Sequence, residues 1–201
     1  MSGQHGDLAG DHGELPVAAR VRRLEERVIA AGLTTDAELD AVLARLYRDA
    51  SPVNGARMAA RAWADPGYAE RLLADGNAAA AELGFGGAGL SYRLKVLANA
   101  PGLHNLVVCT LCSCYPVSLL GPSPSWYKSL AYRSRAVREP RAVLAEFGLA
   151  LPEGTEVAVW DATAETRYLV LPVRPPGTER LGEDELASLV TREGLIGTAA
   201  V

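Results

Sequence analysis

All three cysteines of the chain lie within six residues, at Cys109, Cys112 and Cys114. Thiolates act as nucleophiles and metal ligands, and thiol pairs form disulfides, so this cluster is the first candidate for chemistry. An odd number of cysteines cannot all pair within one chain. The cluster follows an apolar run at 106–108 and precedes a loop rich in proline and serine that starts near Pro116. This position, at the end of a predicted strand, suits a site of redox or metal chemistry.

Three interpretations use the side chains alone. Cys109 and Cys112 have the spacing of a redox pair, but such pairs normally open a helix, which Pro116 disfavours here. A structural zinc site needs four cysteine or histidine ligands. His104, five residues before Cys109, could be the fourth. Inert burial is common for a free cysteine, but it explains poorly why three occur at this spacing.

A fourth interpretation uses the backbone. The amide nitrogens of Ser113 and Cys114 lie between the sulfurs of Cys112 and Cys114, so a metal bound by all four atoms closes three consecutive chelate rings. Cys109 could then occupy one axial position, and the opposite position stays open for water or substrate, as in catalytic metal sites. Such strongly donating, anionic ligands suit trivalent cobalt or iron better than zinc.

The run Val-Cys-Thr-Leu-Cys-Ser-Cys-Tyr-Pro at 108–116 resembles the metal-binding motif of nitrile hydratase α subunits, a family that also contains the thiocyanate hydrolase γ subunit. Further blocks in the family's order resemble it as well, and the similarity spans about residues 15–197. These blocks are Trp126-Tyr127-Lys128, Tyr132-Arg133-Ser134-Arg135, Val137 to Arg141, Val159-Trp160-Asp161, Ala164-Glu165, Arg167-Tyr168 and Leu189 to Arg192.

The resemblance implies a ligand set and a metal. Cys109 would be the axial thiolate, and Cys112 and Cys114 would be equatorial ligands oxidised to sulfinic and sulfenic acid, which are ordinary steps of thiolate oxidation. Ser113 and Cys114 would supply the amide nitrogens. Thr110 and Tyr115 match the cobalt-type variant of the motif, so Co(III) is expected rather than Fe(III).

The resemblance also implies an activity, the addition of water to a nitrile to give an amide, with Cys114, Ser113 and Arg167 as the predicted catalytic residues. Whether a metal-bound hydroxide or the sulfenate oxygen of Cys114 attacks the nitrile stays open. Arg167 could equally form an ion pair with Glu165 at a strand edge. The Ser113 hydroxyl could bind an oxidised sulfur, or the position could simply require a small residue.

The predicted pocket residues are Leu90, Tyr115 and Val117. The family commonly has tryptophan where this chain has Val117, and many members have glutamine where it has Leu90. Losing a large aromatic side chain predicts a roomier pocket for a bulky or heteroaromatic nitrile. In this respect the chain is similar to toyocamycin nitrile hydratase, which acts on a nucleoside nitrile. Packing in the core is an equal account of Tyr115.

The elements that must position these residues divide the chain into a flexible tail at 1–15, a helical region at 16–89 and a metal-binding α/β domain at 90–201. Apolar spacing and start signals predict helices from Pro16, Thr35, Ser51 and Asp65, the last running towards Glu82. Strands are predicted at 92–97, 106–110, 156–160 and 167–171, and shorter helices at 126–132, 140–147 and 183–192. The expected fold class is α+β, a helical arm followed by a mixed, layered α/β domain.

Net charge and hydropathy limit the classes of molecule that this chain is expected to bind. The net charge of −4 argues against nucleic acid as a partner. No run of roughly 20 apolar residues is present, so we expect no membrane span and a cytoplasmic protein. The resemblance implies one or more β subunits, obligate for full activity, and a small nitrile as substrate; the isolated chain could self-associate. The alternatives are a thiocyanate hydrolase γ subunit and a non-catalytic metal-binding module with three cysteines and a histidine.

Overall fold

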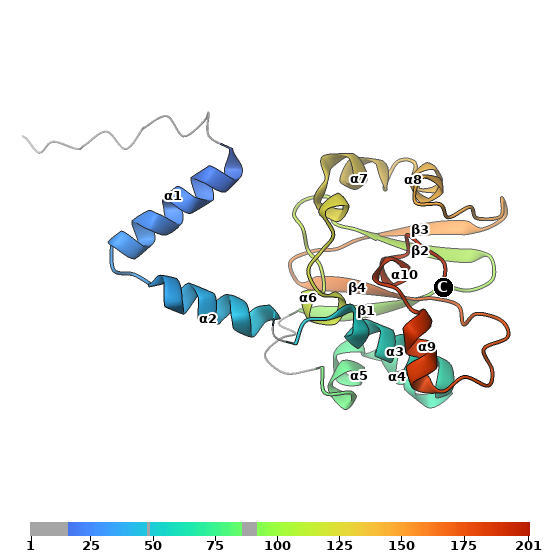
Figure 1. The fold of residues 1–201 in the computed structure, drawn as a ribbon. Helices are drawn as coiled ribbons and strands as arrows, with labels where there is room; N and C mark the ends of the chain where they lie inside the picture. The colour runs from blue at the N-terminus through green and yellow to red at the C-terminus, as the bar shows by residue number, and fades with distance from the viewer. Residues whose placement is uncertain (1–15, 48, 86–91) are drawn as a thin grey trace, which may run out of the picture. The chain divides into compact units, whose positions relative to one another are not determined.

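The computed structural model describes residues 16–47, 49–85 and 92–201, and it confirms the expected α+β fold (Figure 1). The predicted tail at 1–15, the boundary between 89 and 90 and the pocket residue Leu90 lie outside the described residues. Within the described part, no helix is both long enough and apolar enough to cross a membrane. Contacts group the chain into two compact units, Met1–Arg45 and Leu46–Val201.

The first unit contains α1, Val17–Ala30, and most of α2, Asp36–Tyr47. The predicted capping box starts α2: the Glu38 carboxylate accepts from the Thr35 backbone N–H at 2.9 Å, and Thr35 Oγ1 accepts from the Glu38 N–H at 3.2 Å. No residue of α1 is buried. The local capping signal therefore accounts for the start of α2.

Three helices open the second unit: α3, Pro52–Ala64, α4, Pro66–Ala74, and α5, Gly76–Glu82. The predicted helix from Asp65 to Glu82 is wrong in one respect, because it is split at Asp75. Asp75 is extended, and its carboxylate accepts from the N–H groups of Asn77 and Ala78, which starts a new helix. A Cβ atom at Gly76 would lie 2.7 Å from the Leu94 carbonyl oxygen, so glycine lets α5 approach the neighbouring strand.

Four strands form two parallel pairs. Strand β1, Arg93–Ala98, pairs with β4, Thr166–Leu171, and β2, Leu103–Val108, pairs with β3, Glu156–Asp161. Consecutive strands β3 and β4 thus belong to different sheets. In the register of the second pair Val108 lies opposite Asp161, which brings the end of β3 to the start of the cysteine segment.

Short helices complete the second unit. They are α6, Val117–Leu120, a 3₁₀ turn at Ser125–Lys128, α7, Leu130–Arg135, α8, Pro140–Glu146, α9, Glu183–Leu189, and α10, Arg192–Ile196. The helix predicted at 183–192 is interrupted, because Val190 is extended and Thr191 caps α10. Likewise, Ser129 separates the 3₁₀ turn from α7 within the helix predicted at 126–132.

The second unit is layered. Helices α7 and α8 lie on one side of the two sheets and α3 to α5 on the other, with the β2–β3 and β1–β4 pairs stacked between them (Figure 1). One buried hydrophobic cluster runs through these layers and includes Cys109 and Cys114. The metal-binding candidate is therefore anchored in the core rather than on a peripheral loop.

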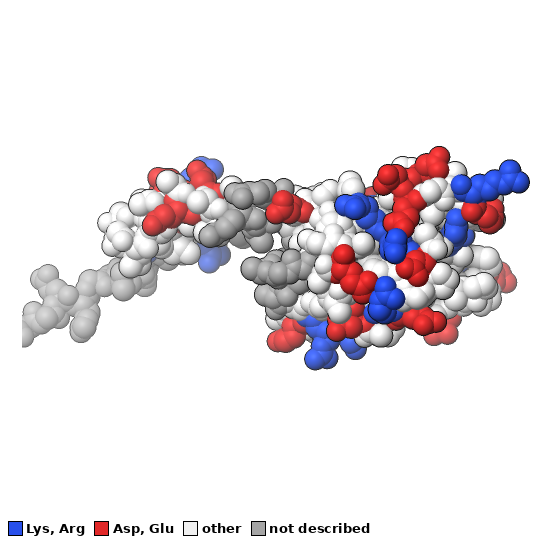
Figure 2. All heavy atoms as spheres, turned by 90° about the horizontal axis from the view of Figure 1, so that it is seen from below, with Lys and Arg blue, Asp and Glu red and all other residues white. Residues whose placement is uncertain are grey.

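The face of the second unit seen in Figure 2 carries interspersed acidic and basic side chains rather than charge of one sign. The second unit also contains ion pairs: Arg61 contacts Glu183 at 2.7 Å, and Arg71 contacts Glu82 at 2.9 Å. Both pairs are about half exposed, so each contributes little stability on its own.

Candidate metal centre

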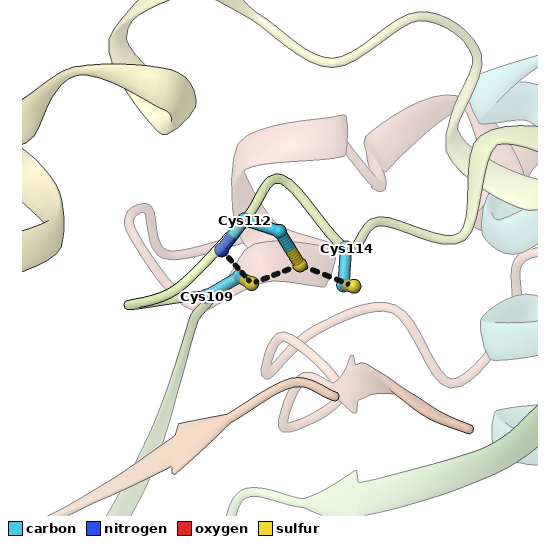
Figure 3. A group of neighbouring side chains, drawn as sticks. All are labelled: Cys109, Cys112 and Cys114. Atoms are coloured by element: carbon cyan, nitrogen blue, oxygen red, sulfur yellow. Dashed lines mark hydrogen bonds between the residues drawn. The ribbon is translucent and has the colours of Figure 1, made fainter. Parts of the chain in front are cut away.

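The three cysteine sulfurs converge after the end of β2 (Figure 3). They lie within 4.8 Å of one another, with 3.2 Å between the Sγ atoms of Cys109 and Cys112 and 2.7 Å between those of Cys112 and Cys114. Cys109 and Cys114 are buried, whereas Cys112 is exposed. The sequence prediction that these thiols act together thus has the required geometry.

The electrostatics of the cluster favour a negative charge on Cys112. Hydrogen bonds from the thiols of Cys114 and Cys109 are the main cause that lowers the pKa of Cys112, to about 7. The amide N–H groups of Cys114 and Ser113 also donate to this sulfur and lower its pKa further. Burial raises the pKa of the Cys114 thiol, while the positive charge of Arg167 acts in the opposite direction.

This arrangement fits a metal held by sulfur and backbone nitrogen. The three sulfurs lie within 4.8 Å of one another, and the amide groups of Ser113 and Cys114 belong to the same short turn. No histidine or carboxylate of the described residues joins the three sulfurs as a fourth side-chain ligand. Amide nitrogens that lose their protons would complete the set, and such a donor set suits a trivalent transition metal.

Charged side chains hold the N-terminal side of the cysteine turn. Asp161, at the end of β3, accepts from the Thr110 N–H at 2.9 Å and from the Thr110 hydroxyl at 2.5 Å. Arg133 of α7 donates from Nε to the Cys109 carbonyl oxygen at 3.0 Å and from Nη2 to that of Thr110 at 2.6 Å. Both faces of the Cys109–Thr110 backbone are therefore fixed by charge-assisted hydrogen bonds.

Buried tyrosine hydroxyls hold backbone carbonyl groups on both sides of the cysteine segment. The Tyr127 hydroxyl donates to the Cys114 carbonyl oxygen at 3.0 Å, and the Tyr132 hydroxyl donates to that of Val107 at 2.6 Å. Tyr127 also packs edge-on against Tyr115, with 5.1 Å between the ring centroids. Sequence analysis assigned no role to Arg133, Asp161, Tyr127 or Tyr132. Only their place in the family-like blocks could have drawn attention to them.

The structure separates the other predicted residues by environment. Ser113 is exposed, and its hydroxyl makes no hydrogen bond to a described residue. Tyr115 is buried in the core, and its hydroxyl has no partner in the described part of the chain. Val117 starts α6, three residues after Cys114, and is partly buried against the core cluster.

The structure also tests two alternative predictions, an ion pair between Arg167 and Glu165 and a zinc site that includes His104. The Arg167 guanidinium donates to the Thr163 carbonyl oxygen and lies over the Tyr92 ring, 5.1 Å from its centroid. The ion pair with Glu165 does not form, although both residues are described. His104 Nε2 lies 2.7 Å from the Gly197 carbonyl oxygen, and the histidine is not part of the sulfur cluster. The zinc site with His104 is therefore not assembled in this structure.

Comparisons with known proteins agree with this geometry. The family model described as nitrile hydratase, alpha chain, matches residues 15–199. The chain is 48% identical to the low-molecular weight cobalt-containing nitrile hydratase subunit alpha of Rhodococcus rhodochrous, over 91% of this chain and 88% of that protein. It is also 49% identical over 158 residues to the thiocyanate hydrolase subunit gamma of Thiobacillus thioparus, which covers 74% of this chain and 65% of that protein.

Solved structures show the same relationship. An Fe-type nitrile hydratase from Comamonas testosteroni Ni1, a double mutant, superposes with a TM-score of 0.83 at 45% identity, covering 91% of this chain and 89% of that one. A recombinant thiocyanate hydrolase with partially modified cobalt centres superposes with a TM-score of 0.82 at 43% identity, over 92% and 90% of the two chains. The sulfur cluster, the layered fold and these matches together show that the chain belongs to the nitrile hydratase α-chain family.

Proposed function

We propose that this chain is the metal-bearing α subunit of a cobalt nitrile hydratase, which converts a nitrile into its amide. The observation that carries the proposal is the convergence of the three cysteine sulfurs within 4.8 Å of one another. Two observations support cobalt over iron. Similar proteins are named as cobalt-containing nitrile hydratases, and this chain has Thr110 and Tyr115 in its cysteine motif. Cys109, Cys112 and Cys114, with the two amide nitrogens, would hold the ion.

When bound, Co(III) would supply a Lewis acid that polarises the reacting groups. The chain's own residues hold and surround it. Cys112 and Cys114, once oxidised to the sulfinate and the sulfenate, would offer acceptor oxygens beside the ion. Arg167 offers a positive charge to the Cys114 side of the centre, in keeping with its effect on the pKa of that thiol. The small Ser113 side chain leaves the exposed edge of the turn accessible.

The same loop suits a partner subunit. Leu111, at the tip of the cysteine turn, is 92% exposed, and Cys112 and Ser113 beside it are also exposed. A large apolar side chain at the edge of a reactive centre is better accommodated when another chain covers it. We therefore assign the second half of the active site to a β subunit in the cytoplasm, and expect the isolated chain to self-associate through this surface.

The test is to express the chain with a nitrile hydratase β subunit in cobalt-supplemented cells and to measure metal content, peptide mass and nitrile hydration. We expect about one cobalt per α chain, two added oxygens on Cys112 and one on Cys114. Cys112→Ser and Cys114→Ser should lose cobalt and activity, because a hydroxyl is a poor ligand for this ion. His104→Ala, outside the cluster, should retain cobalt. Zinc bound to unmodified thiols would instead favour a non-catalytic module.

A thiocyanate hydrolase γ subunit is the second candidate, because the thiocyanate hydrolase γ subunit matches at 49% identity. Assaying thiocyanate against an aromatic nitrile with the same cobalt-loaded complex separates the two activities. Turnover of thiocyanate alone would replace the first proposal and leave the metal site unchanged.

We propose further that Val117 leaves room for a bulky or heteroaromatic nitrile, with Tyr115 as a buried support. Val117→Trp should lower kcat/KM for heteroaromatic nitriles by about 10- to 200-fold and spare acetonitrile-sized substrates. Steady-state kinetics of the assembled enzyme on both classes checks this. Equal losses on small and large nitriles would mean that Val117 supports the start of α6 rather than the pocket.

A further inference from the structure

Three residues from separate elements meet where β1 and β4 begin. Tyr92 immediately precedes β1, Ser118 lies in α6 and Arg167 in β4. The Tyr92 hydroxyl lies 3.1 Å from Ser118 Oγ, and the Arg167 guanidinium carbon lies 5.1 Å from the centre of the Tyr92 ring. Parallel pairing of β1 with β4, where Arg93 lies opposite Thr166, brings the starts of the two strands side by side.

Tyr92 is held at both of its ends. Asn77 of α5 donates from Nδ2 to the Tyr92 carbonyl oxygen at 2.8 Å and accepts from the Leu94 N–H at 2.7 Å. At the other end, the Tyr92 hydroxyl and Ser118 Oγ share a hydrogen bond, and the Ser118 carbonyl oxygen accepts from Asn54 Nδ2 at 2.9 Å. The ring is therefore fixed by polar contacts to α5 and α6.

Arg167 lacks an equally complete set of contacts. Its Nη1 donates to the Thr163 carbonyl oxygen, but its Nε–H is buried without an acceptor in the described part of the chain. The Tyr92 ring is thus the main surface on which the guanidinium rests. A cation stacked on an aromatic face is oriented by the ring as well as attracted to it.

We propose that Tyr92 is a positioning residue for the nitrile hydratase reaction: its ring directs the Arg167 guanidinium towards the Cys114 side of the centre, and Ser118 fixes that ring. The inference rests on the proposed function and adds residues that the sequence analysis did not single out. Because Ser118 directly follows Val117, the same contact links the orientation of Arg167 to the segment we assign to the substrate pocket.

The first experiment needs neither metal nor turnover. In the metal-free α chain, NMR should show the Arg167 Nε–H shifted upfield by the Tyr92 ring and slow to exchange with solvent. Tyr92→Phe retains the ring and should keep the shift, whereas Tyr92→Leu should lose it. A matched control is Phe85→Leu, which removes the ring under Arg57, 5.5 Å from its guanidinium carbon, and should leave the Arg167 signal in place.

The second experiment uses the cobalt-loaded complex with the β subunit. Tyr92→Leu should lower kcat by about tenfold to a hundredfold, since it removes the stacking and the hydroxyl contact together, with KM and cobalt content nearly unchanged. Ser118→Ala and Tyr92→Phe should each cost about twofold to tenfold, with no further loss when combined, because they break the same hydrogen bond. Phe85→Leu should retain the wild-type kcat.

A double-mutant cycle decides whether Tyr92 acts through Arg167. Tyr92→Leu should cost much less in an Arg167→Met background than in the wild type. The proposal is overturned if the two losses multiply independently, or if Tyr92→Leu leaves the NMR signal unchanged. Failure of the proposed function would look different, because the wild-type complex itself would then lack cobalt or nitrile hydration while the NMR result still held.

Discussion

Different kinds of hydrogen bond hold the N-terminal and C-terminal sides of the cysteine turn. On the N-terminal side, the ionised side chains of Asp161 and Arg133 form hydrogen bonds with the backbone of Cys109 and Thr110. On the C-terminal side, the Cys114 carbonyl oxygen accepts from a neutral, buried tyrosine hydroxyl. Between them Leu111, Cys112 and Ser113 are exposed. The fold therefore fixes both ends of the turn and leaves its middle free to wrap an ion and meet a partner.

The difference predicts unequal consequences. Hydrogen bonds to charged groups contribute roughly twice as much as neutral ones, and a buried acceptor left unpaired is costly on either side. Changes on the charged side should therefore disturb both stability and the metal, while changes on the tyrosine side should mainly affect stability.

The largest effect is expected for Arg133→Met. It removes two charge-assisted hydrogen bonds to the carbonyl oxygens of Cys109 and Thr110, so the free energy of unfolding should fall by about 3 kcal/mol and cobalt content should drop with it. Denaturant unfolding and metal analysis measure both. The matched control is Arg138→Met, whose partner is the Ser134 carbonyl oxygen at an exposed site. Equal behaviour of the two variants would refute a special role for Arg133.

Tyr127→Phe should have the next largest effect, about 1–2 kcal/mol of unfolding free energy, because the Cys114 carbonyl oxygen loses its buried donor. Cobalt content should stay close to wild type, since the charged side of the turn is intact. Thermal or denaturant unfolding of the variant gives the value. Tyr168→Phe is the control, because its hydroxyl makes no hydrogen bond to a described residue. A large loss of cobalt from the Tyr127 variant would contradict the comparison.

A smaller change is Thr110→Val. The variant loses the hydroxyl bond to Asp161 but keeps the backbone N–H bond. Because this bond is exposed to solvent, which weakens it, about 0.5–1.5 kcal/mol is expected. Thr110→Ser retains the hydroxyl and should restore most of this. If Ser and Val variants unfold at the same denaturant concentration, the hydroxyl contributes nothing measurable.

The exposed middle of the turn can be probed without changing stability. In the metal-free chain, iodoacetamide should modify Cys112 before Cys109 or Cys114, because Cys112 alone is exposed and its pKa is lowered to about 7. Its rate should rise with pH and level off above about 7, whereas an ordinary thiol, with a pKa near 8.5, keeps accelerating. Peptide mapping by mass spectrometry follows each site. Earlier labelling of Cys114 would show that the turn is not held as described.

Local signals predicted much of the fold. The caps at Thr35, Ser51 and Asp65 and the four strands follow from residue types within a few positions. The helix breaks at Asp75 and Val190 were missed, because the apolar spacing continues across both. The supports of the turn were missed for another reason: Arg133 and Asp161 meet it only through tertiary packing, and nothing local encodes parallel pairing of β2 with β3.

The motif itself carried the prediction of the metal centre, because sulfur and amide donors are adjacent in the chain. The contact between the side chains of Tyr92 and Arg167 could not be predicted in this way. Tyr92 and Arg167 approach one another across the β1–β4 pair, so their contact depends on register rather than on spacing. Sequence therefore predicted the candidate ligands but not the side chains that surround them.

Parallel pairing of β2 with β3 has a consequence for the order of assembly. Asp161, which accepts both hydrogen bonds from Thr110, lies 51 positions after it in the chain. During synthesis at about 5–20 residues per second, the thiols leave the ribosome seconds before this carboxylate does. Until then the turn lacks its charged support, since non-local pairing is a late and slow step of folding. The hydrogen bonds from Thr110 to Asp161 can therefore form only after β3 has paired with β2. We expect stable binding of cobalt only at this late stage of translation.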